Sequence, residues 1–256
     1  MNSIAKHIGS NLYEFYDSIS QICGMETDKQ KHWSVSKNAP GYWPRLVYQV
    51  DQDIMVPEVS ATFSEKAKSG QLPELLIASD ENIRQIDPFL RQQGFYPFTA
   101  WKGMALTSLQ NVTPQELPDA IEIVKPESAT ELEQWLKIVN TELVSPLKME
   151  ESLLKSLIAL PEFDVYLLQK DGTGVSTILV FESIESTGLY LIATEKSAQK
   201  QGFARLLVHH ILWQHAQRSK KPVILHATQS GESMYLKLGF QPINQFFLYR
   251  NLKLNL

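Results

Sequence analysis

Cysteine is almost missing from this sequence, because Cys23 is the only one in 256 residues. A single cysteine can neither form an intrachain disulfide nor supply the thiolates of a zinc site, so a disulfide-stapled secreted domain is excluded and a reducing, cytoplasmic setting is the default. Residues 1–21 lack the apolar core of a signal peptide. No run approaches the ~18 consecutive apolar residues of a membrane helix, and we expect no membrane partner.

An excess of positive charge is missing too. Lysine and arginine total 24 against 28 acidic residues, which gives a net charge of −4. Binding to nucleic acid or to an anionic membrane surface normally needs a basic stripe, so we expect neither partner and find a neutral or cationic substrate easier to accommodate. The hydrophobic fraction of 43% is ordinary for a globular protein, and the length leaves one large domain or two small ones open.

Metal-ligand spacing is also absent where histidines gather, at His209, His210 and His215. No two of them lie at positions i and i+4, and no carboxylate accompanies them at ligand spacing. Surface or partly packed histidines are therefore the better interpretation, and we predict no metal.

The second half of the chain is regular enough to assign element by element. Strands are predicted where apolar residues alternate or run together, and helices where they recur with a period near 3.6. The predicted strands are residues 121–126, 163–170, 175–183, 188–194, 222–228 and 245–252, and the predicted helices are residues 128–143, 149–160, 204–218 and 233–240. This order indicates an α/β (α+β) fold with a mixed, mostly antiparallel sheet that carries helices on both faces.

The first half is less readable. Residues 11–22 look helical, and residues 45–52 and 74–79 look like strands. A polar segment with two prolines within residues 102–122 is the best candidate for a linker. An irregular loop carries four aromatic residues, which either line a substrate pocket or, as the safer interpretation, pack in the core: Trp33, Tyr42, Trp43 and Tyr48.

A weak internal repeat relates the two halves at an offset of 145 residues. The matched positions are Gly94-Phe95-Tyr96-Pro97 with Gly239-Phe240-Gln241-Pro242, Trp101 with Phe246, and Met104 with Tyr249. We interpret them as a divergent repeat of strand, helix, Gly-Phe and strand. Chance is the alternative, because Gly-Phe is a common ending of a helix.

One loop has the properties of a phosphate-binding turn: Gln199-Lys200-Gln201-Gly202-Phe203-Ala204 leads from a predicted strand into a predicted helix. The first turn of a helix presents N–H groups that have no intrahelical acceptor and carries the positive end of the helix dipole. A phosphate binds well there when the backbone is free of a side chain, as Gly202 permits. Taken alone, the pattern is equally typical of an ordinary strand-to-helix connection.

The loop resembles the signature [Q/R]-x-x-G-x-[G/A] of the GNAT superfamily of acyl-CoA-dependent N-acyltransferases. A second family motif, a helix with a tyrosine followed by Leu-Gly-Phe, resembles residues 228–240, with Tyr235 in the tyrosine position. The resemblance covers residues 121–252 and includes the order of the predicted elements. It implies a GNAT-like fold and an N-acetyltransferase that uses acetyl-CoA as co-substrate.

The resemblance also implies roles for individual residues. Backbone N–H groups from Gln201 to Arg205 would hold the CoA pyrophosphate, and the strand end before the loop would bind the pantetheine arm and polarise the thioester carbonyl. Tyr235 would protonate the leaving thiolate or donate a hydrogen bond to it, with a packed interface tyrosine as the alternative. The implied cofactor-binding residues are Ile192, Ala193, Thr194, Gln199, Lys200, Gln201, Gly202, Phe203, Ala204, Arg205 and Thr228.

The sequence departs from the family pattern at Lys196, where proline is frequent, and at Thr228, where asparagine is frequent. These changes put the exact loop conformation and one supporting hydrogen bond in question. An attacking amine must also lose a proton, since a lysine-like amine is almost fully protonated at pH 7. Glu182, Glu185 and Glu195 are the nearest carboxylates, but each is more typical of a solvated turn, and none is assigned as the base.

We therefore predict two tandem halves: an N-terminal domain of residues 1–112, interpreted as a degenerate GNAT-like copy without a cofactor loop, and a catalytic domain of residues 119–256. Leu90 stands at the position of Tyr235 in the first half, so one acetyl-CoA per chain is expected. Because Cys23 lies outside the catalytic domain, direct transfer to a small-molecule or peptide amine in a ternary complex is expected, and an oligomer is compatible with it. The alternatives are a non-catalytic acyl-CoA-binding or regulatory protein, or a longer acyl donor.

Overall fold

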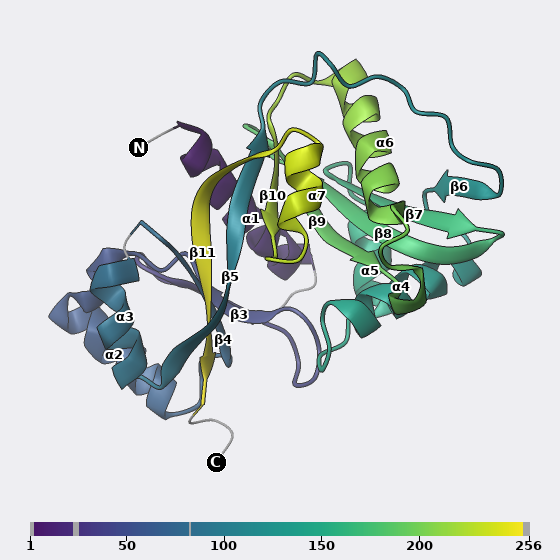
Figure 1. The fold of residues 1–256 in the computed structure, drawn as a ribbon. Coiled ribbons are helices and arrows are strands. Elements are labelled where there is room, and N and C mark those ends of the chain that lie inside the picture. The colour runs from purple at the N-terminus through teal and green to yellow at the C-terminus, as the bar shows by residue number, and fades with distance from the viewer. Residues whose placement is uncertain (1–2, 23–25, 82, 253–256) are drawn as a thin grey trace.

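The computed structural model describes residues 3–22, 26–81 and 83–252. Its strands form one eleven-stranded sheet in the order β1-β2-β3-β4-β11-β5-β10-β9-β8-β7-β6. Cys23 lies outside the described residues. The chain is therefore organised around a single continuous sheet, which Figure 1 shows as strongly twisted.

The first part of the chain supplies one end of this sheet. Its strands are β1 (Glu26–Lys29), β2 (Ser34–Lys37), β3 (Arg45–Tyr48), β4 (Leu75–Ser79) and β5 (Phe95–Leu106), and its helices are α1 (Ser3–Ile22), the 3-10 helix η1 (Gln52–Met55), α2 (Pro57–Lys68) and α3 (Ile83–Gln92). The predicted strand 45–52 ends at Tyr48, because Gln49 adopts a positive φ of 57°. The predicted helix 11–22 begins eight residues earlier, at Ser3.

The second part supplies the other end. Its strands are β6 (Ile121–Val124), β7 (Phe163–Lys170), β8 (Thr173–Glu182), β9 (Thr187–Thr194), β10 (Val223–Ala227) and β11 (Gln241–Asn251), and its helices are α4 (Ala129–Glu142), α5 (Glu151–Ile158), the 3-10 helix η2 (Lys196–Ala198), α6 (Phe203–Arg218) and α7 (Glu232–Lys237). Every element predicted for this half occurs, and the largest shift is at β11, which begins at Gln241 rather than at residue 245.

The linker predicted within residues 102–122 is wrong in its first part. Residues 102–106 belong to β5, where Leu106 pairs with Val223 and Ala105 with Gln241. Cross-strand pairing on both sides overrides the weak local pattern of this segment. The connection to β6 is therefore confined to residues 107–120.

Two helical layers cover the sheet. On one face, α1, α4 and α5 bury a cluster that includes Phe15, Trp135 and Leu154. On the other face, α6 and α7 pack against β8 to β10, and α2 and α3 pack against β3 and β4. We call these the α1 face and the α6 face. Trp33 and Tyr48 are fully buried, which supports the packing interpretation of these two aromatic residues.

The two longest central strands come from opposite parts of the chain and lie side by side (Figure 1). β11 pairs with β4 as well as β5, and β5 pairs with β10 as well as β11, so the last strand of each part joins the sheet of the other. The register pairs Trp101 with Phe246, Pro97 with Tyr249, and Met104 with Pro242. These are positions matched at an offset of 145 residues. Exchanging the two strands maps Pro97–Tyr249 onto Met104–Pro242 and leaves Trp101–Phe246 in place.

Candidate active site

The parallel strands β9 and β10 begin as neighbours and then part. Their register runs through three pairs and ends at Leu189 and Leu225, although β9 continues to Thr194 and β10 to Ala227. Beyond this point the edge of β9 that faces β10 has no ladder partner. We call the opening between the two strands the fork.

A β-bulge changes the direction of β9 within the fork. Leu191 has a positive φ of 47°, and the register with β8 shifts between Thr177 and Leu179. On the β8 side, the hydroxyl of Thr177 donates to the carbonyl of Leu191 at 3.0 Å, and that of Ser176 to the carbonyl of Ala193 at 2.7 Å. The bulge is thus held from one side, which leaves the other side of β9 turned toward the fork.

The loop after β9 is built by side-chain hydrogen bonds. Glu195 accepts from the N–H and the hydroxyl of Ser197 and so caps η2. The amide of Gln199 donates to the carbonyl of Thr194 at 3.1 Å and to Glu142 at 3.3 Å, and the amide of Gln201 donates to the carbonyl of Ser197. These contacts explain why the loop holds its shape without a proline at residue 196.

Helix α6 begins without a capping side chain. Its N-cap is Gly202, with a φ of 91°, and no acidic residue lies in its first turn. A Cβ added to Gly202 would meet no atom within 4 Å, so the space in front of the backbone is open. The first intrahelical bond runs from the N–H of Leu206 to the carbonyl of Gly202, which leaves the amides of Phe203 to Arg205 as donors without an intrahelical acceptor.

Tyr235 lies on α7 in the same hydrophobic cluster of the α6 face as Leu189 of β9, with Ile192 and Phe203 packed against that cluster. Ile192, Phe203 and Tyr235, which are distant in sequence, thus all contribute to one apolar cluster on the α6 face. The ring of Tyr235 packs edge-on to Phe240 at 5.9 Å, and burial raises the pKa of its hydroxyl well above the usual value. No described residue makes a hydrogen bond to this hydroxyl, and its raised pKa keeps it protonated at neutral pH.

Thr228 supports the approach to α7. Its hydroxyl accepts from the N–H of Gly231 at 3.3 Å and lies 3.1 Å from the hydroxyl of Ser230. Its carbonyl accepts from the N–H of Glu232. The side chain is exposed and fixes the turn before α7.

The three carboxylates considered as bases lie apart. The hydrogen bonds from Ser197 lower the pKa of Glu195, which acts as a cap rather than a proton acceptor. Burial raises the pKa of Glu182, but contacts from His215 and Thr187 and the charge of Arg218 outweigh it, so the pKa lies below its ordinary value. Glu185 is exposed, 3.8 Å from His7. Local contacts account for all three carboxylates. Glu182 and Glu185 lie near the start of β9, where it pairs with β10, and we call this the closed end of β9.

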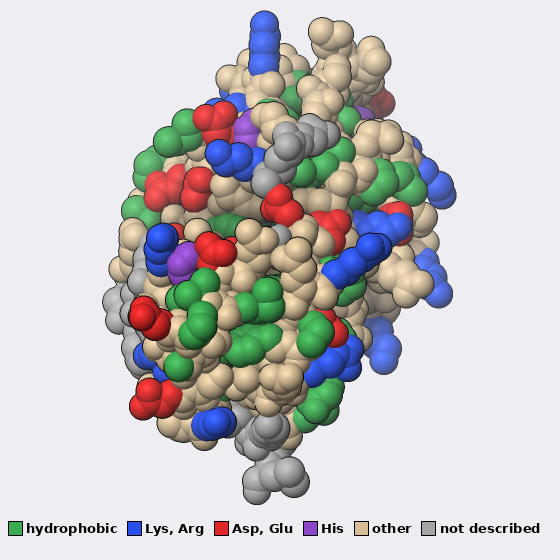
Figure 2. Space-filling view, turned by 90° about the vertical axis from the view of Figure 1, so that its left-hand side faces the viewer, with side chains coloured by type: hydrophobic (Ala, Val, Ile, Leu, Met, Phe, Trp, Pro, Cys, Tyr) green, Lys and Arg blue, Asp and Glu red, His purple; other side chains and the backbone are tan. Residues whose placement is uncertain are grey.

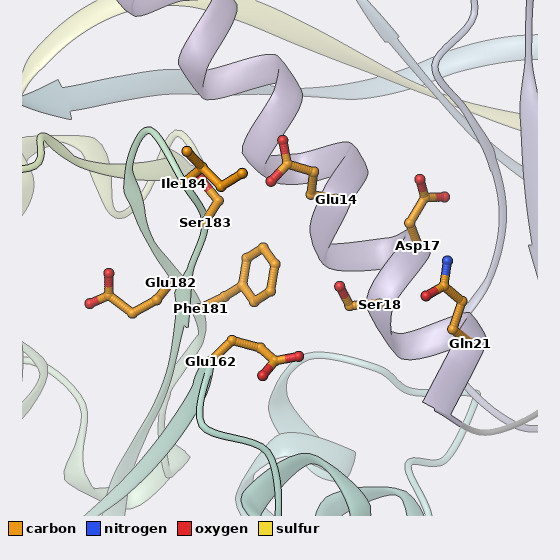
Figure 3. A pocket seen from close by; sticks show the side chains of 9 residues that line it. All are labelled: Glu14, Asp17, Ser18, Gln21, Glu162, Phe181, Glu182, Ser183 and Ile184. Atoms are coloured by element: carbon orange, nitrogen blue, oxygen red, sulfur yellow. The ribbon is translucent and has the colours of Figure 1, made fainter.

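A cavity of about 370 Å³ lies between α1 and the β8–β9 turn (Figure 3). Four of its nine lining residues carry carboxylates, and burial together with the charge of Asp17 raises the pKa of Glu14. The lining residues are Glu14, Asp17, Ser18, Gln21, Glu162, Phe181, Glu182, Ser183 and Ile184. This cavity is at the end of β9 opposite the loop and is separate from the fork.

The histidines of α6 do not gather into a metal site. His215 is buried and contacts Thr187 and Glu182, and His210 pairs with Gln214. Within the described part of the chain, ligand-like spacing occurs at His32, Asp51 and Asp53 instead. There Asp51 caps η1 through the N–H of Asp53, so the group already has a structural explanation.

Sequence reasoning overlooked His226, a histidine within the otherwise apolar strand β10. Both of its ring nitrogens are buried without a hydrogen-bond partner, and burial lowers the pKa of the imidazole to about 3. It is the first residue of β10 beyond the last pair with β9. The signal that could have found it is a single ionisable residue in a central, apolar strand run.

Figure 2 shows one face of the molecule, where acidic and basic side chains are interspersed with apolar ones. No basic stripe crosses this face. Among the helices that the structure describes, none combines the length and the apolar character needed to cross a membrane.

Comparison with known proteins identifies the second half by sequence and the whole chain by shape. A family model for the acetyltransferase (GNAT) domain matches residues 124–254. A GCN5-related N-acetyltransferase from Kribbella flavida is similar over 98% of this chain and 97% of that chain, with a TM-score of 0.69 at 15% sequence identity. A search of curated proteins finds no match for the sequence.

Two further solved structures extend the likeness of fold. A GCN5-related N-acetyltransferase from Sphaerobacter thermophilus has a TM-score of 0.63 at 15% identity, covering 85% of this chain and 76% of that chain. A tandem GNAT protein from the clavulanic acid biosynthesis pathway has a TM-score of 0.58 at 10% identity over the same shares of the two chains. At such low identity the likeness establishes the fold. Since the family model spans just over half of the chain and agrees with the fold, this protein belongs to the GNAT acetyltransferase family.

Proposed function

We propose that the protein transfers an acetyl group from acetyl-CoA to the amine of a small molecule or peptide, directly and in a ternary complex. The observation that carries this proposal is the juxtaposition of the fork with the uncapped, glycine-led start of α6. A side-chain cap is missing at α2, α5 and α7 as well, but each of those helices carries an acidic residue in its first turn, which α6 lacks.

The cofactor contacts follow from these surfaces. Amides from Gln201 to Arg205 would donate to the pyrophosphate of acetyl-CoA, where the helix dipole and the positive charges of Lys200 and Arg205 favour an anion. Lys200 has a positive φ of 62° and leads into Gly202, so successive N–H groups turn around one concave stretch of backbone. The open space before Gly202 fits this use.

The reacting end of the substrate would lie in the fork. Backbone groups of Ile192 to Thr194 would bind the pantetheine arm, and an N–H of this strand would stabilise the oxyanion that forms when the amine attacks. Tyr235 would donate its proton, or a hydrogen bond, to the departing thiolate. Because burial raises the pKa of this hydroxyl, the tyrosine is protonated at neutral pH, as a donor must be.

We further propose that residues 1–112 are a degenerate GNAT-like copy and residues 119–256 the catalytic domain. Two observations support it: parallel pairing recurs at β3–β4 and at β9–β10, and β5 and β11 pair as an exchanged couple centred on Trp101 and Phe246. Leu90, fully buried on α3, takes the place of Tyr235. One acetyl-CoA per chain follows, and the single cysteine supports a cytoplasmic setting.

The test combines calorimetry with a thiol assay. Acetyl-CoA should bind with one site per chain, and release of free CoA should require an amine from a panel of polyamines, amino sugars, amino acids and short peptides. Binding without thiol release for any amine would favour the alternative, an acyl-CoA sensor. Two sites per chain would contradict the degenerate first half, and no binding would reject the proposal.

A further inference from the structure

We propose that His226 is a catalytic residue that accepts the N–H of the attacking amine at the fork, on the opposite face of the sheet from Tyr235. The inference rests on the proposed acyl transfer. It adds the protein group that binds the substrate amine during the reaction. The sequence had left this role unassigned.

The position of His226 is set by the register. Leu225 forms the last pair with β9, and His226 follows it, where the two strands separate. Side chains alternate along a strand, so His226 lies on the α1 face with Ile224, whereas Leu225 lies on the α6 face with Tyr235. A thioester held in the fork would thus have Tyr235 on one side and His226 on the other.

The surroundings of the imidazole are aromatic. Its ring lies 4.8 Å from Phe246, 6.1 Å from Tyr190 and 6.3 Å from Trp101, measured between centroids. The residue keeps a partly exposed edge, but both ring nitrogens are buried and lack a partner. A buried polar group without a hydrogen bond destabilises a fold, so two on one ring in a central strand need an explanation.

A neighbouring residue, Asn244, also has a buried polar atom without a hydrogen-bond partner. His226 pairs with Gly103 of β5, and Gly103 pairs with Asn244 of β11, so the three form one row across the sheet. The Oδ1 atom of Asn244 is also buried without a partner. Unpaired buried polar atoms on neighbouring residues beside the fork are expected where a polar group of a ligand binds.

Close to the row on the same face, the polar groups between α1 and β9 are paired, although the indole nitrogen of Trp135 on α4 also lacks a partner. The hydroxyl of Tyr190 donates to Asn11 at 2.7 Å, and the amide of Asn11 donates to Ser186. These bonds tie α1 to β9. The row differs from this neighbouring network in having two residues with unpaired buried atoms, His226 and Asn244.

The chemistry balances with the two residues on opposite sides. The ammonium form of the acceptor first loses its extra proton to water. The neutral amine then donates an N–H to a ring nitrogen of His226 and directs its lone pair at the thioester carbon. A carbon–nitrogen bond forms, the carbon–sulfur bond breaks, and the thiolate takes a proton from Tyr235 or solvent. The proton lost by the nitrogen passes to the imidazole and on to water. Because burial favours the neutral ring, the imidazole does not retain that proton.

The first experiment replaces the ring nitrogens while keeping an aromatic side chain. His226→Phe should bind acetyl-CoA like the wild type and melt no lower, but transfer to the best amine of the panel should fall by about 100-fold or more, within the range of general base catalysis. His209→Phe is the matched control, because its Nδ1 is also buried and unpartnered but lies on α6. His226→Gln serves as a second variant if the first does not fold. Unchanged transfer in either folded variant would overturn the inference.

A second experiment needs no acceptor. In uniformly ¹⁵N-labelled protein, in which histidine ring nitrogens and backbone amides are both observed, acetyl-CoA should shift the ring signals of His226 more than CoA does. The ring signals of His215, which contacts Thr187 at the start of β9, should not change. A shift of the Gly202 amide without one at His226 would overturn the inference while leaving cofactor binding intact. A shift at neither position would reject the proposed function together with it.

Discussion

Helices α2 and α6 occupy equivalent places in the two parts of the molecule but begin differently. Each connects the strands of a parallel pair, β3–β4 for α2 and β9–β10 for α6. Helix α6 starts at Gly202 with no cap and no acidic residue in its first turn, whereas α2 starts after Val56 with Pro57 and Glu58. Proline removes an N–H donor and a carboxylate repels a phosphate. We therefore expect an anion to bind at the start of α6 and not at the start of α2.

The strands before these two helices also differ, in how far each extends beyond its last parallel pair. β9 runs five residues past its last pair with β10 and turns an unpaired edge toward the fork. β3 ends at Tyr48, one residue past its last pair with β4, and Gln49 turns away. We therefore expect that a cofactor site needs more than this topology: an open strand edge, and a helix start that keeps its N–H donors and carries no carboxylate, since α2 also lacks a side-chain cap.

The largest effect should come from closing the start of α6. Gly202→Val places a branched side chain at a positive φ and in the open space before the amides, so we expect the Kd for CoA to rise by about 100-fold or more. Gly172→Val is the matched control, since Gly172 also has a positive φ and open surroundings but lies in the β7–β8 hairpin. Calorimetry measures both. Equal affinity losses in the two variants would mean that backbone strain, not the site, is responsible.

Much of the second half could be predicted because its signals are local. Apolar alternation predicts β7 to β9. Gly202, directly before α6, indicates a helix start whose N-cap residue adopts a left-handed conformation. The capping box of Ser128 and Glu131 confirms the start of α4. The roles inferred for the loop residues and for Tyr235 stay predictions.

The first half was harder to predict for a physical reason. β1, β2 and β3 are four-residue strands that depend on neighbours, and α2 follows a 3-10 turn in a polar segment. β5 gains its full length from pairing with β10 and β11, which no local pattern reveals. His226 was missed because the sequence does not show whether a single histidine is buried or whether its ring nitrogens have hydrogen-bond partners.

A second comparison sets Tyr235 of α7 against Tyr249 of β11, which packs under α3. Tyr235→Phe should lower kcat by about 100-fold with little change in CoA affinity, because only the proton donor is removed. Tyr249→Phe removes a hydroxyl that donates to Asp87 at 2.8 Å, and should reduce thermal stability without changing kcat. Steady-state kinetics with thermal melting separates the two. An unchanged kcat in Tyr235→Phe removes its role as an acid.

The smallest effect is expected from the charge beside the amides. Arg205 is exposed in the first turn of α6, so Arg205→Ala should weaken CoA binding by about two- to five-fold, as expected for a solvent-screened contact. Lys220→Ala removes the same charge from an exposed position beyond the other end of the helix and should have no effect. The difference between these variants should shrink as salt rises from 0.05 to 0.5 M, roughly tracking the Debye length. A loss that persists at high salt would mean that Arg205 acts through packing or a buried hydrogen bond, and the amides alone would then account for the attraction between α6 and the anion.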